Sequence, residues 1–362
     1  MKENNVEKLD FSIVVCCYFG EKTIVRCLDS LINQKYSNSD YEIIIVDDGS
    51  IDNSTIVIRV FLESLSKDKP LIKYFRTENN GLSKARNFGI DKSDGKYVLF
   101  IDEDARACTD WLHEYNSTIM NNDYPDVVYG LVKPFDSANW FEKFITNTFY
   151  DKFDKDGNQI PVLIGTNMGY KKQLFHDGDG FFDDYTYRGD ENIFIMSLAK
   201  PFSELSNIDA FVCHENPNQF INWLRERFQN GEAEYIIDKF KVKFLKLEKN
   251  NFILKKIVKK IFIILILFIL FLLEINLFYT SIILLSSIYF FVRKDMKIRR
   301  AHLIDSGYNL IYLNLFLSII LRISGFFIKE LGYAKRLIMN ELFSPNRGNF
   351  ADKIVEQIII DK

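Results

Sequence analysis

Hydrophobic residues in the first hundred positions form short continuous runs, and stretches with helical spacing separate these runs. The runs occupy residues 11–17, 42–46, 71–75 and 97–101. Apolar residues recur at i, i+3, i+4 and i+7 in the intervening stretches, at Ile24, Cys27, Leu28 and Leu31 and again at Ile58, Phe61, Leu62 and Leu65. A further short helix is expected at 82–90. This alternation predicts an α/β domain with a doubly wound parallel sheet that helices cover on both faces.

Polar residues follow three of the predicted strands at the point where each strand ends. Tyr18 follows the first, Asp47 and Asp48 follow the second, and the acidic turn 102–104 follows the fourth. Doubly wound sheets bind ligands beyond the carboxyl ends of their strands. The first turn, CCYFGE, lacks G-x-G-x-x-G, and the chain has no G-x-x-x-x-G-K-[ST] string, which argues against a dinucleotide and a glycine-rich phosphate loop.

The acidic turn Asp102-Glu103-Asp104 places two carboxylates two positions apart at the end of an apolar strand. Clustered carboxylates repel each other and burial penalises each of them, so a cation between them would stabilise the turn. Oxygen ligands favour Mg²⁺ or Mn²⁺, and these ions usually keep substrate phosphates among their ligands. A bare D-x-D is more often a solvated acidic turn, so the metal site depends on the neighbouring motifs.

Four strings appear in a fixed order within residues 11–105: FSIVVCCYFGEKTIVRCLDSL, EIIIVDDGSIDNS, NNGLSKARNFGI and GKYVLFIDEDA. Together they resemble the nucleotide-binding half of the family 2 glycosyltransferases, which have the GT-A fold. The resemblance is to the membrane-anchored bacterial type with C-terminal transmembrane segments. It implies a nucleoside diphosphate sugar as donor, with a UDP-sugar favoured, and Mg²⁺ or Mn²⁺ as cofactor.

The resemblance also assigns roles on the base side of the nucleotide. Tyr18 would lie against the nucleobase, and Asp48 would accept a hydrogen bond from the base imide N–H. Asp47, beside it, is counted with the nucleotide-binding residues, although an Asx turn at 47–50 is the alternative. Arg86, in the A-R-N-x-G string, would line the nucleotide, or else lie on a helix surface.

The metal side follows from the same resemblance. Asp102 would lie near the ribose and within reach of the metal, and Asp104 would be the metal ligand. His214 follows a short apolar strand and is a candidate for a further metal or diphosphate contact, with a packed histidine as the alternative.

From about residue 126 to 215 the strand pattern breaks up and aromatic residues become frequent. Residues 163–198 resemble the acceptor-side segment of the family, with a G-x-N string ending at Asn167 and an acidic pair that opens a helix. An inverting transfer needs a carboxylate to take the proton of the acceptor hydroxyl. By position this base is Glu191, with Asp190 as the alternative, although acids at a helix N-terminus also stabilise the helix dipole.

Two further groups are candidate diphosphate or acceptor contacts. Asn167 is one of them. The string QFINWLRERFQNG resembles the family's Trp- and Arg-bearing helix near the donor diphosphate. Arg225 and Arg227 lie two positions apart and cannot share a helical face, so at most one of them would reach a phosphate.

Two apolar runs, 261–273 and 277–292, are separated by Glu274-Ile275-Asn276 and predict a transmembrane helical hairpin over 257–292. Lysine and arginine flank both ends of this hairpin, and the turn contains neither. The positive-inside rule then predicts a multi-pass cell-membrane protein with a cytoplasmic catalytic domain. A third stretch, 308–328, is expected to be an interfacial or re-entrant helix in preference to a third span.

Composition adds three limits to this picture. The net charge of −3, with no basic stripe before residue 230, argues against nucleic acid as a partner. The five cysteines form no C-x-x-C pair, which fits free thiols in a reducing compartment. The N-terminus has no apolar segment of the secretory type.

The predicted protein is an inverting, metal-dependent glycosyltransferase that acts on a hydroxyl of a lipid-linked or polysaccharide acceptor in cell-surface glycan biosynthesis. The alternatives are a catalytically silent membrane scaffold that binds sugar nucleotides, and a nucleotidyltransferase. The predicted segments are a polar tail (1–10), a GT-A domain (11–232, with a nucleotide-binding half at 11–125 and an acceptor half at 126–232), a basic linker (233–256), the hairpin (257–292), a basic loop with the third apolar stretch (293–343) and a cytoplasmic tail (344–362).

Overall fold

The computed structural model describes residues 9–146, 152–153, 159–160, 162–178, 180–181, 189–198, 203–244, 325, 328–333 and 335. These residues fall into two compact units. The first contains residues up to 146 together with 160–218, and the second contains 147–159 together with residues from 219 to 356.

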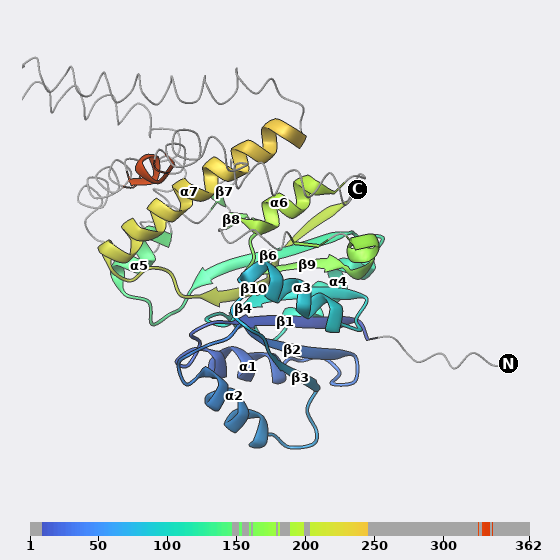
Figure 1. The fold of residues 1–362 in the computed structure, drawn as a ribbon. Helices are drawn as coiled ribbons and strands as arrows, with labels where there is room; N and C mark the ends of the chain where they lie inside the picture. Colours follow the sequence, from blue (N-terminus) through green and yellow to red (C-terminus); the bar gives the residue numbers. More distant parts are fainter. Residues whose placement is uncertain are drawn as a thin grey trace, which may run out of the picture. The chain divides into compact units, whose positions relative to one another are not determined.

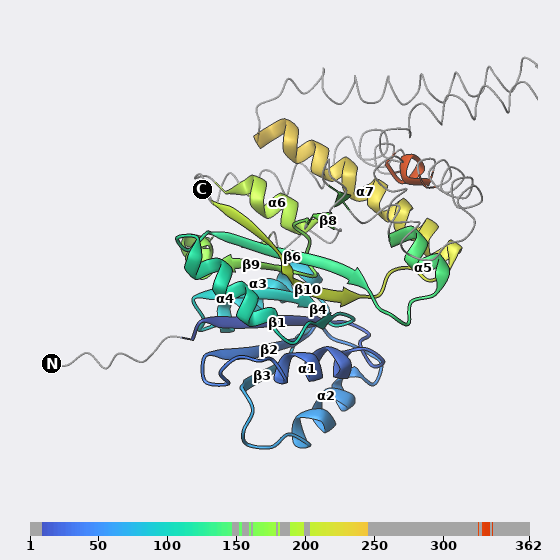
Figure 2. The same cartoon turned by 180° about the vertical axis from the view of Figure 1, so that it is seen from behind.

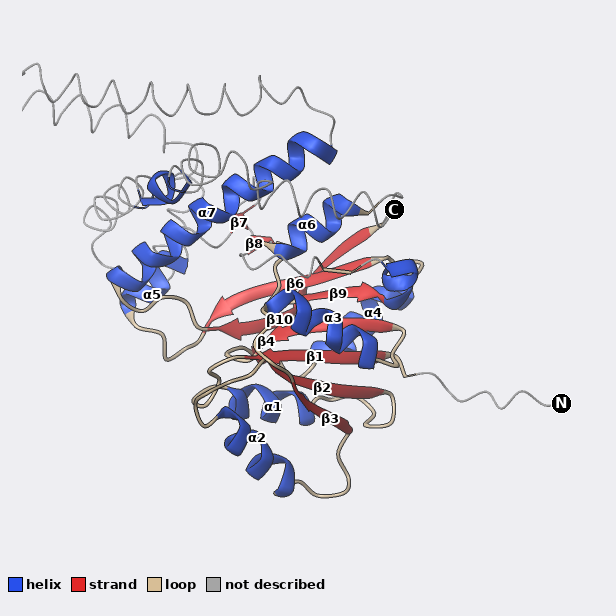
Figure 3. Ribbon diagram, viewed as in Figure 1, coloured by secondary structure: helices blue, strands red, loops and turns tan. Residues whose placement is uncertain are grey.

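An eight-stranded mixed sheet forms the centre of the first unit (Figures 1 and 3). Its strands, in spatial order, are β3 (Leu71–Arg76), β2 (Tyr41–Asp47), β1 (Phe11–Cys17), β4 (Tyr97–Asp102), β9 (Met168–Lys171), β6 (Val127–Pro134), β10 (Glu204–His214) and β5 (Arg106–Ala107). Strands β1 to β4 are parallel, β9 is antiparallel to β4 and β6, and β10 is parallel to β6. The carboxyl ends of β1, β2, β4, β6 and β10 therefore meet at one edge. Strands β7 (Lys152–Phe153) and β8 (Gln159–Ile160) pair separately.

Helices cover both faces of this sheet, and each face has its own apolar cluster. On one face lie α1 (Ile24–Ile32), α2 (Ser54–Glu63) and α4 (Trp111–Asn121). On the other lie α3 (Leu82–Lys92), the 3₁₀ helix η2 (Lys172–Gly178) and α6 (Asp190–Ser197). Accordingly, α3 stands in front of the sheet in Figure 1 and α4 in the reverse view of Figure 2. A short helix, α5 (Trp140–Ile145), follows β6.

The hydrophobic pattern predicted the nucleotide-binding half closely. The four expected strands are β1 to β4, the three expected helices are α1 to α3, and the parallel arrangement is confirmed for these strands. Strands β6, β9 and β10 lie where the pattern breaks up. Strand β9 has four residues, and a Cβ on its Gly169 would lie 2.3 Å from Leu99 of β4, so this strand depends on its neighbours more than on its own sequence.

Asn167 connects α4 with two strands in the interior of the first unit. Its Oδ1 accepts hydrogen bonds from Trp111 Nε1 (2.9 Å) and the Tyr115 hydroxyl (2.5 Å). Its Nδ2 donates to the carbonyl oxygens of Leu131 in β6 and Ala210 in β10, each at 2.8 Å. The side chain is fully buried, and these four bonds use its two donors and both acceptor positions.

The second unit contains α7 (Phe220–Phe244), which packs against residues 328–333. A Cβ on Gly231 would lie 1.8 Å from the carbonyl oxygen of Lys329, so glycine permits the close approach of the two segments. The rings of Tyr235 and Tyr333 meet edge to face at 5.3 Å. Helix α7 crosses the boundary that was expected at residue 232 and continues into the expected linker.

The predicted membrane location is corrected by the structure. Among the residues described, no helix combines the length and the apolar character needed to cross a bilayer. Helix α7 has the length but carries charges such as Arg225, Glu232 and Asp238. On this finding the prediction of a multi-pass, membrane-anchored protein with a cytoplasmic catalytic domain is wrong. The expected hairpin at 257–292 and most of the stretch 308–328 lie outside the described residues.

The buried hydrogen bonds of Asn167 predict a large cost for its removal. Asn167→Ala should lower the free energy of unfolding by about 3 kcal/mol or more, because it leaves buried donors and acceptors of both strands and α4 unpaired. Asn33→Ala, at the exposed end of α1, is the control and should change it by about 0.5 kcal/mol or less. Denaturant unfolding followed by tryptophan fluorescence would measure both, and equal effects would contradict the role given to Asn167.

Candidate active site

Three of the predicted residues meet at the carboxyl edge of the sheet. Asp102 is the last residue of β4, Asp104 lies in the turn before β5, and His214 is the last residue of β10. His214 Nε2 lies 3.1 Å from Asp104 Oδ1 and 3.9 Å from Asp102 Oδ2. One potential ligand atom from each residue lies within 4.8 Å of the others.

The chemistry of this cluster fits a divalent cation. Asp104 Oδ1 is buried, and apart from the contact with His214 it has no hydrogen-bond partner among the described residues. Burial disfavours the charged form of His214, but Asp104, Asp102 and Glu103 outweigh it and raise the pKa of this histidine to about 9. The acids thus hold a proton on His214, and two carboxylates with an imidazole could hold Mg²⁺ or Mn²⁺ when that proton leaves.

Arg86 connects this cluster to α6. The Arg86 side chain is 4% exposed, and its Nη1 lies 2.6 Å from both carboxylate oxygens of Asp190. Its Nη2 lies 3.7 Å from Asp102 Oδ1. Gly89, one turn further along α3, allows the helix to approach the sheet, since a Cβ there would lie 2.4 Å from Val14 Cγ1. Gly165 leaves room for the guanidinium, because a Cβ there would lie 2.2 Å from Arg86 Nη2.

The two acidic residues at the start of α6 have different hydrogen-bond partners. Asp190 faces Arg86, whereas Glu191 accepts a hydrogen bond from the Asn192 side chain at 3.0 Å. Both acids are buried. Burial and the neighbouring Asp190 raise the pKa of Glu191 to about 8, although Arg86 acts in the opposite direction. The two adjacent carboxylates therefore have different partners.

The base-side residues surround the loops after β1 and β2. Tyr18 is 40% exposed and meets Phe19 edge to face at 4.3 Å. Asp48 accepts hydrogen bonds from the backbone N–H groups of Asn80 (3.0 Å) and Gly81 (2.8 Å). Asp48 thus fixes the loop that leads into α3, while the Tyr18 ring is open to solvent.

Asp47 is fully buried and bonded within the protein. It accepts hydrogen bonds from the Ser50 N–H (2.9 Å) and from the hydroxyls of Thr55 (2.6 Å) and Tyr74 (3.2 Å). Burial favours the neutral form, but these bonds outweigh it and lower the pKa of Asp47. The geometry gives Asp47 a structural place at the end of β2.

Comparison with known proteins agrees with this geometry. Residues 12–178 match the profile of the family described as Glycosyl transferase family 2. Glycosyltransferase AglE of Haloferax volcanii is 33% identical over 228 residues, which are 62% of this chain and 72% of that protein. The chain belongs to glycosyl transferase family 2.

Another relative is the poly(ribitol-phosphate) beta-glucosyltransferase of Bacillus spizizenii, 29% identical over 211 residues, or 56% of this chain and 32% of that protein. The chain spans about a third or less of the length of the first curated relatives it matches. Among solved structures, one similar fold is the mannosyltransferase PcManGT of Pyrobaculum calidifontis in complex with GDP-Man and Mn²⁺. The match covers 94% of this chain and 89% of that protein, with a TM-score of 0.53 and 14% sequence identity. At this identity the likeness shows the fold, and the expected GT-A-like α/β fold is confirmed, with a mixed sheet.

Three further residues of this family 2 chain were predicted to contact the diphosphate or the acceptor: Asn167, Arg225 and Arg227. Asn167 is occupied in the core and has no free group for a ligand. Arg225 and Arg227 belong to α7 in the second unit, where Arg227 Nη2 pairs with Glu226 at 2.9 Å, so their contact with a phosphate stays a prediction.

Two residues at the site were missed from the sequence. The hydroxyl of Thr166 donates a hydrogen bond to Asp102 Oδ2. Arg26, on α1, donates to the carbonyl oxygen of Asp104. Their separations from the acidic turn, 64 and 78 positions, gave no signal in the sequence.

The geometry at the sheet edge predicts a measurable metal affinity. Asp104→Asn should weaken Mn²⁺ binding about tenfold or more, because it removes one anionic ligand. Asp110→Asn is the matched control, since Asp110 is a half-exposed acid paired with Lys35 outside the cluster. Electron paramagnetic resonance of free Mn²⁺ would measure both affinities. Equal affinities in the two variants would exclude Asp104 as a ligand.

Proposed function

We propose that this protein is an inverting glycosyltransferase that moves a sugar from a nucleoside diphosphate sugar to an acceptor hydroxyl. The observation that carries the proposal is the joint position of two groups at one sheet edge. The cation-binding set of Asp102, Asp104 and His214 lies beside the acidic start of α6, and Arg86 contacts both. Membership of glycosyl transferase family 2 supports the same activity.

The donor would lie across the carboxyl ends of β1, β2 and β4. The exposed ring of Tyr18 offers a stacking surface for the base, and Asp48 shapes the adjoining loop. Held by Asp102, Asp104 and His214, Mg²⁺ or Mn²⁺ would neutralise the charge of the departing diphosphate. A UDP-sugar is the favoured donor.

We assign the general base to Glu191. Both carboxylate oxygens of Asp190 accept from Arg86 Nη1 at 2.6 Å, so this carboxylate is already engaged in an ion pair within the protein. Burial and the neighbouring Asp190 raise the pKa of Glu191, which suits a group that has to take up a proton. In the transfer, the acceptor oxygen forms a bond to the anomeric carbon, the bond from that carbon to the diphosphate breaks, and Glu191 takes the hydroxyl proton.

The acceptor is proposed to be a lipid-linked or polysaccharide hydroxyl in cell-surface glycan synthesis. The relative named for poly(ribitol-phosphate) supports a polymer of the cell surface as the acceptor class. The aromatic-rich region after β6, which includes the half-exposed Trp140 of α5, offers rings of the kind that pack against sugars.

The assignment of the base predicts a specific loss of turnover. Glu191→Gln should lower kcat by about 10²-fold or more and leave donor affinity nearly unchanged, because the amide keeps the shape but cannot take a proton. Glu63→Gln, at the exposed end of α2, is the matched control. Release of nucleoside diphosphate from a panel of sugar nucleotides would report the rates. The proposal fails if no sugar nucleotide is turned over, and the base assignment fails if Glu191→Gln is as active as wild type.

The raised pKa of Glu191 predicts the direction of the pH dependence. Glu191 is a base only when ionised, so kcat/KM should rise with pH through a step near 8 and level off above it. The measurement is kcat/KM from pH 6 to 9.5 at saturating Mg²⁺. In Glu191→Asp the step should move to lower pH, because the ordinary pKa of aspartate is lower than that of glutamate. A flat wild-type profile would contradict the assignment.

A further inference from the structure

Arg26 touches three of the segments that end at the active-site edge. Its Nη2 donates to the carbonyl oxygen of Asp104 at 2.9 Å and to Glu215 Oε1 at 2.7 Å. Its guanidinium carbon lies 4.2 Å from the centre of the Phe135 ring. Glu215 directly follows the last residue of β10, and Phe135 directly follows the last residue of β6.

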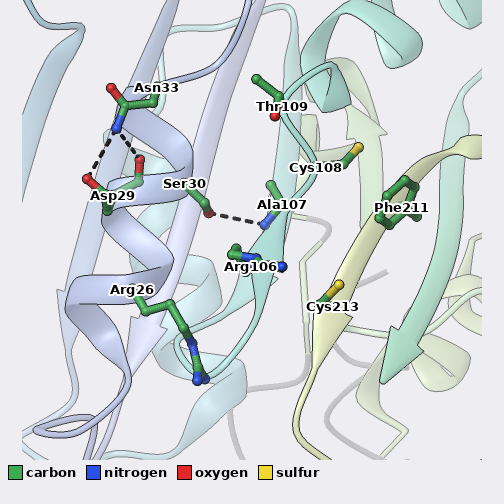
Figure 4. A pocket seen from close by; sticks show the side chains of 10 residues that line it. All are labelled: Arg26, Asp29, Ser30, Asn33, Arg106, Ala107, Cys108, Thr109, Phe211 and Cys213. Atoms are coloured by element: carbon green, nitrogen blue, oxygen red, sulfur yellow. Dashed lines mark hydrogen bonds between the residues drawn. The ribbon is translucent and has the colours of Figure 1, made fainter. Parts of the chain in front are cut away.

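The position of α1 makes this contact possible. The buried stripe of α1, which includes Cys27, fixes the helix on the sheet and turns Arg26 toward the strand ends. Arg26 also lines a pocket of about 470 Å³ between α1, β5 and β10. Figure 4 shows its side chain extending from α1 toward the side of this pocket where β5 and Cys213 of β10 lie.

The two groups that share the Arg26 guanidinium belong to the loops that carry two metal-ligand candidates. Asp104 is itself a candidate ligand, and Arg26 donates to its backbone carbonyl, while the Asp104 carboxylate faces His214. Glu215 is the neighbour of His214, so its position sets the end of β10. Fixing both loops to one rigid, planar group limits the distance between Asp104 and His214, which now lie 3.1 Å apart.

We propose that Arg26 is a positioning residue for the divalent-cation site, acting through the backbone of Asp104 and through Glu215 beside His214. This inference rests on the proposed cation site of Asp102, Asp104 and His214. Arg26 itself is a cation and contributes no ligand. Its contribution is to hold two loops from different strands at the spacing that one ion requires.

Charge and positioning predict opposite results when Arg26 is removed. A cation near a cation site repels the ion, so loss of its charge alone would strengthen Mn²⁺ binding. Loss of the contact to both loops would weaken it, and second-shell losses of this kind are typically about tenfold or more. The sign of the change in affinity therefore separates the two effects.

The experiment measures Mn²⁺ affinity by electron paramagnetic resonance in the full-length protein without donor or acceptor. Arg26→Gln is expected to weaken binding about tenfold, and Arg26→Lys is expected to recover part of the loss because its ammonium still donates hydrogen bonds. The matched control is Arg106→Gln, since Arg106 lies over the same Phe135 ring at 5.4 Å but has no hydrogen bond to Asp104 or Glu215 among the described residues. Arg106→Gln should leave the affinity unchanged or slightly higher.

A double variant tests whether Arg26 and Glu215 act through one contact. Glu215→Gln should weaken Mn²⁺ binding, and Arg26→Gln/Glu215→Gln should bind about as weakly as Arg26→Gln alone, with melting temperatures close to wild type throughout. Unchanged or stronger binding in Arg26→Gln, or fully additive losses in the double variant, would overturn the inference and leave the proposed function standing. If the wild-type protein binds no Mn²⁺, both the cation site and this inference fail.

Discussion

Crowding of carboxylates at the carboxyl edge of the sheet is the constraint around which the first unit is arranged. Asp102 and Asp190 come from opposite halves of the domain, and the buried guanidinium of Arg86 lies between them. A buried arginine or a buried carboxylate without a partner would each cost several kcal/mol. The approach of α3 to β1, which Gly89 permits, and the space beside Gly165 both serve to bring this cation to its place.

The two acidic pairs at the strand ends differ in how far the protein satisfies them. Asp47 accepts hydrogen bonds from the Ser50 N–H and the Thr55 hydroxyl, and Asp48 accepts from two backbone N–H groups of the loop that leads into α3. Asp102 and Asp104 face His214, and apart from its contact with His214 the buried Oδ1 of Asp104 has no hydrogen-bond partner among the described residues. Carboxylate oxygens that lack a full set of hydrogen-bond donors can still bind a cation. Carboxylate oxygens that are fully hydrogen-bonded stabilise the loops around them instead. The same residue type thus has two uses at neighbouring strand ends.

The antiparallel strand β9 pairs with β4 on one side and β6 on the other, and so joins the two halves of the domain. The two residues before it have different roles. Thr166 donates a hydrogen bond to Asp102 at the site, while Asn167 turns into the core and bonds α4, β6 and β10. Both residues lie in the turn that precedes β9, and their side chains reach different partners, so one short stretch serves both purposes. The fold and the site are therefore mechanically connected through this segment.

The hydrophobic pattern by itself determined β1 to β4, α1 to α3 and the acidic turn at 102–104, because buried parallel strands and amphipathic helices have local signatures. The same pattern predicted that Tyr18, Asp48 and Asp104 lie at one edge of the sheet, since the carboxyl ends of parallel strands meet at the same edge. Tertiary structure decided the remainder. Strands β6, β9 and β10 are stabilised by neighbours distant in sequence, and the partners of Asp102 lie at positions 86, 166 and 214. The sequence placed Asn167 with the ligand contacts, and burial assigned it to the core. Which acid of the pair 190–191 Arg86 binds depends on how α3 and α6 pack together on one face of the sheet, and no local pattern encodes that distance.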